Sequence, residues 1–182
     1  EGRIADEMII RENDIKGKGG SPIHVLEDNE NVSIENVFTE VVKPMDADKR
    51  ARVRGFMDVS GVLGAYTNEE AAREFLEQVK EIKELDDVKY VLFYGRKNEK
   101  EDHAPDCLMA ISRRTGEKLI LEKSLESFLK SKGITKNNIF VYYDQRHCEA
   151  TDIKQHPNAI NLLSVGESIE RRSLMQAMLR LR

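Results

Sequence analysis

Several features are scarce or missing from this 182-residue sequence. It contains no tryptophan, four prolines and only two cysteines, Cys107 and Cys148. Two cysteines are too few for a disulfide framework, and they favour free thiols in a reducing compartment. No run of 18 apolar residues and no signal segment occur, so we expect no membrane span and a cytoplasmic location.

An excess of one charge is also missing. The sequence has 29 Lys and Arg against 33 Asp and Glu, which gives a formal net charge of −4. A global basic field that would attract nucleic acid is therefore excluded. Arg113, Arg114 and Lys118 could touch phosphate, but no aromatic residues are interleaved with them. Nucleic acid or a protein track stays open as a partner, without support from the charge pattern.

The two ends of the sequence indicate a fragment of a larger protein. No methionine opens the chain, and Arg182 falls inside a helical pattern. Residues 1–54 predict an N-terminal arm or linker, with a short strand over residues 23–26. The glycine-rich stretch at residues 16–22 lacks the spacing of a Walker A phosphate loop, so we interpret it as a connector.

From residue 55 onward, strands and helices alternate. Continuous apolar runs predict strands, and these cover residues 56–59, 90–94, 139–143 and 160–165. Such runs are typical of strands that are covered on both faces. The alternation predicts an α/β domain over residues 55–182, with a mainly parallel central sheet.

Helix signals fall between these runs. Thr67 and Glu70 have the spacing of a capping box, which predicts a helix start. Leu125, Phe128 and Leu129 predict a short helix that Gly133 ends. A last helical pattern runs from Ser168 to the end of the chain. Residues 108–111 and 118–121 predict a small inserted hairpin.

Ligands of parallel α/β sheets bind beyond the carboxyl ends of the strands. We therefore expect a site at the loops after Val59, Tyr143 and Val165. Two polar segments stand out, residues 144–154 after a buried strand and residues 176–182 on the last helix. On that helix Gln176 and Arg180 share one face, because they lie four residues apart.

These segments resemble two motifs of superfamily-two ATPases. Residues 150–154, Ala-Thr-Asp-Ile-Lys, resemble the Gly-Thr-Asp of motif V, and Gln176, Arg180 and Arg182 resemble motif VI. The pattern is most similar to very large, uncharacterised proteins of eukaryotes and intracellular bacteria; for a bacterial member, the location would be the host cytosol. The shared residues are Tyr143, Asp144, Gln145, His147, Asp152, Ile153, Lys154, residues 163–166, Gln176, Arg180 and Arg182.

The resemblance implies the C-terminal RecA-like lobe of a helicase-like ATPase, built as a three-layer sandwich. It places Thr151 and Asp152 at the nucleotide, and Gln176, Arg180 and Arg182 as catalytic residues at the phosphates, where the arginines act like arginine fingers. The cofactor would be ATP with Mg²⁺, bound mainly by a preceding lobe of the same polypeptide. This chain alone is therefore not expected to hydrolyse ATP.

Departures from the motifs keep other functions open. Ala150 and Leu179 stand where glycine is usual, which removes backbone freedom and favours a non-catalytic RecA-like scaffold as an alternative.

Some of the similar proteins are labelled thiol-dependent ubiquitin hydrolases, so Cys148 beside His147 is a second alternative. Adjacent residues of an extended chain point to opposite sides, which places His147 poorly as the base. A zinc site from His103, Cys107, His147 and Cys148 has feasible spacing, but adjacent ligands are unusual. We therefore predict no metal ligands.

Overall fold

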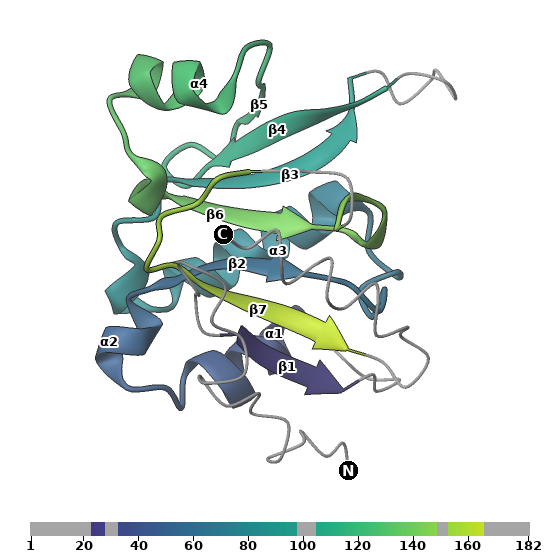
Figure 1. Ribbon diagram of the computed structural model, residues 1–182, viewed down its shortest axis with the longest axis vertical. Helices are drawn as coiled ribbons and strands as arrows, with labels where there is room; N and C mark the ends of the chain where they lie inside the picture. The colour runs from purple at the N-terminus through teal and green to yellow at the C-terminus, as the bar shows by residue number, and fades with distance from the viewer. Residues whose placement is uncertain (1–22, 28–32, 98–104, 149–152, 166–182) are drawn as a thin grey trace.

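The computed structural model describes residues 23–27, 33–97, 105–148 and 153–165. Within these residues, seven strands form one sheet, in the order β1-β7-β2-β6-β3-β4-β5. The strands are β1 (Ile23–Glu27), β2 (Val53–Met57), β3 (Tyr90–Arg96), β4 (Asp106–Ser112), β5 (Lys118–Ile120), β6 (Ile139–Tyr143) and β7 (Ile160–Val165). The first five strands in this order run parallel, and their direction is visible in Figure 1. The predicted α/β class with a mainly parallel sheet is confirmed.

The predicted hairpin is also confirmed. β4 pairs antiparallel with β3, and β5 pairs antiparallel with β4, which extends the sheet at one edge. β2 begins at Val53, three residues earlier than the predicted strand, and ends at Met57. The charged residue Arg54 interrupts the apolar run, which is why the sequence hides the first half of this strand.

Helices and helical turns connect the strands. They are α1 (Ile34–Val37), a π-helix (Phe38–Val42), α2 (Ala47–Arg50), α3 (Asn68–Lys80), α4 (Leu125–Lys132) and three 3₁₀ turns (Lys83–Leu85, Lys136–Asn138, Gln145–His147). The Thr67–Glu70 capping box is present at the start of α3, and Gly133 ends α4 with a φ of 62°. In the described part of the chain, no helix is long and apolar enough to span a membrane.

The sheet carries apolar residues on both faces. On one face α1, the π-helix and α3 pack, with Phe75 of α3 at the centre of an aromatic group. Its ring centroid lies 5.2 Å from that of Phe140 and 5.3 Å from those of Phe56 and Tyr142. On the other face Leu129 of α4 packs with strand residues. This layering is compatible with a three-layer sandwich.

Residues upstream of 55 join the same packed unit. β1 pairs with β7 along its whole length. Ile34, Phe38 and Val42 are 0% exposed and belong to the core beside α3. The sequence placed the domain boundary at residue 55, whereas in the structure the core extends back to at least residue 34.

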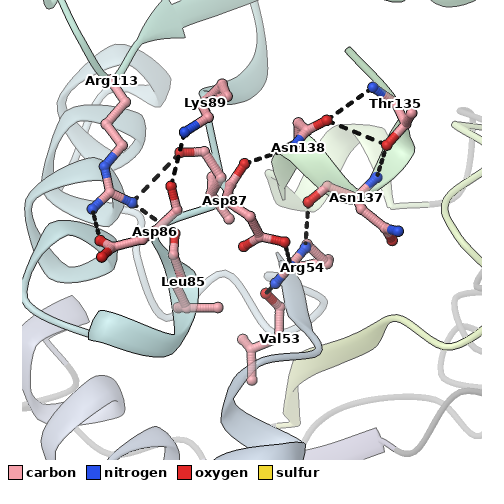
Figure 2. Close-up of polar contacts among 11 residues, drawn as sticks. Val53, Arg54, Leu85, Asp86, Asp87, Lys89, Arg113, Thr135, Asn137 and Asn138 are labelled. Carbon is pink, nitrogen blue, oxygen red and sulfur yellow. Dashed lines mark hydrogen bonds and ion pairs between the residues drawn. The ribbon is translucent and has the colours of Figure 1, made fainter.

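The amino ends of the parallel strands are fixed by a network around Arg54, which is 4% exposed (Figure 2). Its guanidinium donates to the carbonyls of Asn137 and Val53, both at 2.8 Å, and to the Asp87 carboxylate at 2.7 Å. Nearby, Arg113 donates to the carbonyl of Leu85 at 2.6 Å. The Arg54 bonds tie β2 to the loops that enter β3 and β6, and the Arg113 bond ties the end of β4 to the loop before β3.

Candidate site at the carboxyl edge of the sheet

Three strand ends meet at the opposite edge of the sheet. β2 lies between β6 and β7, and the chain passes from β6 to β7 across it. The connections that leave the neighbouring strands β2 and β6 therefore run in opposite directions along the sheet, toward β3 and toward β7. Parallel α/β sheets bind ligands at the carboxyl ends of such strands. In Figure 1 the carboxyl ends of these three strands lie on the same side of the molecule. The carboxyl ends of β2, β6 and β7 therefore share one edge of the sheet.

Asp58, directly after β2, organises the first of these loops. This carboxylate is 2% exposed and accepts hydrogen bonds from the backbone N–H groups of Val62 and Leu63, both at 2.9 Å. The hydroxyl of Ser164 in β7 donates to it at 2.7 Å, and the same hydroxyl accepts from the N–H of Ser60 at 3.1 Å. Asp58 thus joins the loop after β2 to the end of β7.

Burial raises the pKa of Asp58 above its ordinary value. Desolvation disfavours the charged form, while the hydrogen bonds from Ser164, Leu63 and Val62 favour it and oppose the shift. Donors from the loop and from β7 therefore offset part of the desolvation of this carboxylate.

The loops after β2 and β6 are in direct contact through Gly61 and Gln145. Gly61 has a φ of 72°, a conformation that L-residues rarely adopt. A Cβ at this position would lie 2.8 Å from Oε1 of Gln145. The Gln145 amide also donates to the carbonyl of Val59 at 3.5 Å, so the two loops form one polar surface.

His147 lies between two carboxylates in the loop after β6. Its Nδ1 is hydrogen-bonded to Oδ1 of Asp144, and its Nε2 lies 3.3 Å from Oδ2 of Asp106 at the start of β4. The imidazole stacks on the ring of Tyr94 in β3, with centroids 4.4 Å apart and planes within 8°. Arg146 lies 3.5 Å from both carboxylates and is 64% exposed.

The charges of this group act on Asp144. Burial alone would raise the pKa of Asp144, but the hydrogen bond and charge of His147, the Asn68 amide and Arg146 together lower it. Asp144 is therefore held in its charged form, as expected for a carboxylate beside cationic donors.

The two cysteines lie on opposite faces of the sheet and are free thiols. Cys148 is 1% exposed, and its Sγ lies 3.3 Å from the carbonyl oxygen of Asp144. His147 directs both ring nitrogens at carboxylates, so this arrangement does not favour thiol catalysis. Of the zinc candidates, His103 lies outside the described residues. Over residues 33–97, 105–148 and 153–165, no group of three His, Cys, Asp or Glu side chains is placed to hold a metal.

The residues to which the motif resemblance assigns a role at the nucleotide lie outside the described part of the chain. These are Thr151, Asp152, Gln176, Arg180 and Arg182. The description stops at Cys148 and resumes at Ile153, whose carbonyl accepts a hydrogen bond from the Tyr143 hydroxyl at 3.4 Å. Their roles therefore remain predictions.

Two residues of this edge escaped the sequence analysis as participants: Tyr94 and Asp106. One signal in the sequence could have indicated Asp106. If β3 and β4 pair as a hairpin, Asp106 lies opposite Arg96 at the end of the pair where the connecting loop begins. The contact between that carboxylate and His147 depends on sheet order, which no local pattern reveals.

Comparison with known proteins finds no matching family model, no matching curated protein and no matching solved structure. The chemistry of this edge must therefore be judged from its own residues.

Proposed function

We propose that this chain is the second RecA-like lobe of a helicase-like ATPase, and that it completes an ATP site begun by a preceding lobe. The observation that carries the proposal is that the carboxyl ends of β2, β6 and β7 lie side by side, and that the connections leaving β2 and β6 run in opposite directions along the sheet. The loop after β6 leads into Thr151 and Asp152, and the chain after β7 leads to the helical pattern of Arg180 and Arg182.

The described residues of this edge suit contact with a nucleotide but not with its metal ion, which the other lobe would bind. Asp58, Asp144 and Asp106 are each engaged by donors of this chain. The edge also presents donors, which suit phosphate and ribose oxygens. These are the exposed Arg146 and Gln145 side chains and the buried Ser60 hydroxyl, which has no hydrogen-bond partner in the described structure.

In this proposal Asp152 and Thr151 contact the nucleotide, and Gln176 lies near the phosphates. Arg180 and Arg182 neutralise the negative charge that develops on the γ-phosphate during transfer. ATP would supply the phosphoryl group, and Mg²⁺, held mainly by the preceding lobe, would shield its charge. A planar guanidinium can bind two phosphate oxygens at once, which an ammonium group cannot do.

The test is ATP hydrolysis by the full-length protein that contains this chain. Arg180→Ala should lower kcat by a factor on the order of 10³ or more, the range for arginine fingers. Arg180→Lys should not restore it. The matched control is Arg114→Ala, at an exposed arginine in the hairpin turn, which should leave kcat unchanged. Undiminished hydrolysis by Arg180→Ala would reject the proposed role.

A non-catalytic RecA-like scaffold is the second candidate. The contacts of Asp58, Asp144 and Asp106 favour it, because an edge whose carboxylates already accept from donors of the same chain needs no ligand to be stable. The same protein decides between the two functions. A scaffold would neither bind a fluorescent ATP analogue nor hydrolyse ATP.

A further inference from the structure

The buried side-chain atoms that lack a hydrogen-bond partner gather mainly at one point of the sheet. Among the described residues there are five such nitrogen and oxygen atoms, and three of them belong to two amides. These are Nε2 and Oε1 of Gln155 and Oδ1 of Asn161, a residue that is 1% exposed. Buried amides in native proteins almost always have partners, so this pair requires an explanation.

Gly55 brings the two amides together. In the middle of β2 it pairs with Asn161 of β7 on one side and with Val141 of β6 on the other. A Cβ at Gly55 would lie 2.2 Å from Oδ1 of Asn161 and 3.1 Å from Nε2 of Gln155. The glycine therefore leaves room for the Asn161 amide over the strand, and Gln155 reaches the same point from the chain between β6 and β7.

The surroundings of these amides are apolar. Side chains alternate between the two faces of a strand, so Asn161 shares its face with Leu163, two residues farther along β7. Leu163, Val141, Met57 and Ile153 belong to one buried apolar cluster. In such surroundings an amide costs free energy unless its donors and acceptors are paired.

The two amides cannot satisfy one another completely. The three atoms comprise one donor group, Nε2 of Gln155, and two acceptors. A direct bond from Gln155 to Asn161 would leave Oε1 of Gln155 without a donor. A water molecule has two O–H donors and also accepts hydrogen bonds, so one molecule can serve both acceptors and the donor group. Buried waters typically make about three such bonds.

We infer that Gln155 and Asn161 bind one ordered water molecule beside Gly55, and that this water fastens the β6–β7 connection to the centre of the sheet. The described part of that connection, residues 153–159, forms no helix or strand. It therefore lacks a regular backbone hydrogen-bond pattern, and side-chain anchors must hold it. Buried Ile153 is one anchor, and the water adds a second at Gln155. The water site would exist whether or not this chain binds a nucleotide.

The first test is a high-resolution crystal structure of the wild-type protein. We expect one water oxygen within about 3.2 Å of both Oδ1 of Asn161 and the Gln155 amide. In solution, magnetic relaxation dispersion of the solvent counts long-lived internal waters. That count should fall by one when Gln155→Met and Asn161→Leu are combined, since these changes nearly preserve side-chain volume and remove the polar atoms.

Stability distinguishes a shared water from two independent amides. Each single variant should raise the equilibrium constant for unfolding about tenfold, because the remaining amide loses a partner while it stays buried. The double variant should stay within about threefold of the wild type, because neither amide remains. The matched control is Asn158→Leu, at an exposed asparagine of the same connection, which should change neither the water count nor the stability.

A water that contacts both amides, together with this non-additive pattern, would support the site. A wild-type structure in which the amides bond directly, or in which a water contacts only one of them, would overturn it. Additive losses, about a hundredfold in the double variant, would overturn it as well, because they would show that the two amides act independently.

Discussion

The two edges of the sheet use charged side chains in opposite ways. At the amino edge, Arg54 is buried and donates to two backbone carbonyls, with the half-exposed Asp87 as a third partner (Figure 2). At the carboxyl edge, the buried groups are carboxylates. Asp58 accepts from the amides of a single loop, and Asp144 accepts from the side chain of His147.

This difference indicates what each edge can do. Backbone carbonyls held by strands and tight turns cannot move to accept another donor, so the Arg54 network contributes only stability. Side-chain partners such as His147 and Gln145 can rotate toward a ligand at the cost of a few hydrogen bonds. The carboxyl edge therefore combines order with exchangeable contacts, as a binding site requires.

The largest expected effect is at the amino edge. Arg54→Met should destabilise the protein by about 3 kcal/mol, because the buried carbonyl of Val53 loses its donor and the part-buried bond to the Asn137 carbonyl is lost as well. The pair with Asp87 contributes little to this loss, since that carboxylate is 48% exposed. Urea unfolding followed by circular dichroism measures the change.

The control for this variant is again Arg114→Ala, which should stay within about 0.5 kcal/mol of the wild type. Arg54→Lys should recover less than half of the loss, because one ammonium group does not reproduce the guanidinium fork. A loss below about 1 kcal/mol in Arg54→Met would show that the Arg54 network does not stabilise the amino edge as described.

Local signals predicted most of the described fold. The Thr67–Glu70 capping box, Gly133 as a helix end and the apolar runs at β3, β6 and β7 depend on neighbours in the sequence, and all are confirmed. The spacing of Ile34, Val37, Phe38 and Val42 is also helical. It could have placed this segment in the core, but the polar residues between them obscured it.

What the sequence did not reveal depends on contacts between distant segments. Arg54 reads as an interruption of a strand until its partners at Asp87 and Asn137 are known. The contact of Asp106 with His147 exists because the sheet places β3 between β6 and β4. Asp152 and Arg180, which carry the proposed chemistry, lie outside the described residues, so their juxtaposition stays a prediction.

The pH dependence of stability distinguishes two carboxylates of the same edge. The pKa of Asp144 is lowered from 3.8, so its charged form favours folding; that contribution is present above this value and is lost as the pH falls through the lowered pKa. Asp144→Asn should cost about 2 kcal/mol at neutral pH, and the difference from wild type should shrink in acid. Unfolding free energies measured across the acidic range test this.

Asp58 provides the matched comparison, because its pKa is raised. Its contribution is largest below 3.8 and declines as the pH rises through the raised pKa. The stability difference between wild type and Asp58→Asn should therefore fall as the pH rises above 3.8, whereas that for Asp144→Asn rises as the pH approaches 3.8 from below. If the stability difference changed with pH in the same direction for both variants, the opposite pKa shifts of Asp58 and Asp144 would be contradicted.

The smallest expected effect tests the contact between the loops after β2 and β6. Gly61 and Gly116 have nearly equal φ values of 72° and 69°, but only Gly61 faces a neighbour, Gln145, within 4 Å. Both changes to Ala should cost about 1 kcal/mol in backbone strain, and Gly61→Ala about 0.5 kcal/mol more because Gln145 must shift. Adding Gln145→Ala should bring Gly61→Ala back to the level of Gly116→Ala. Equal unfolding midpoints for the two single variants would show that the loops do not constrain one another.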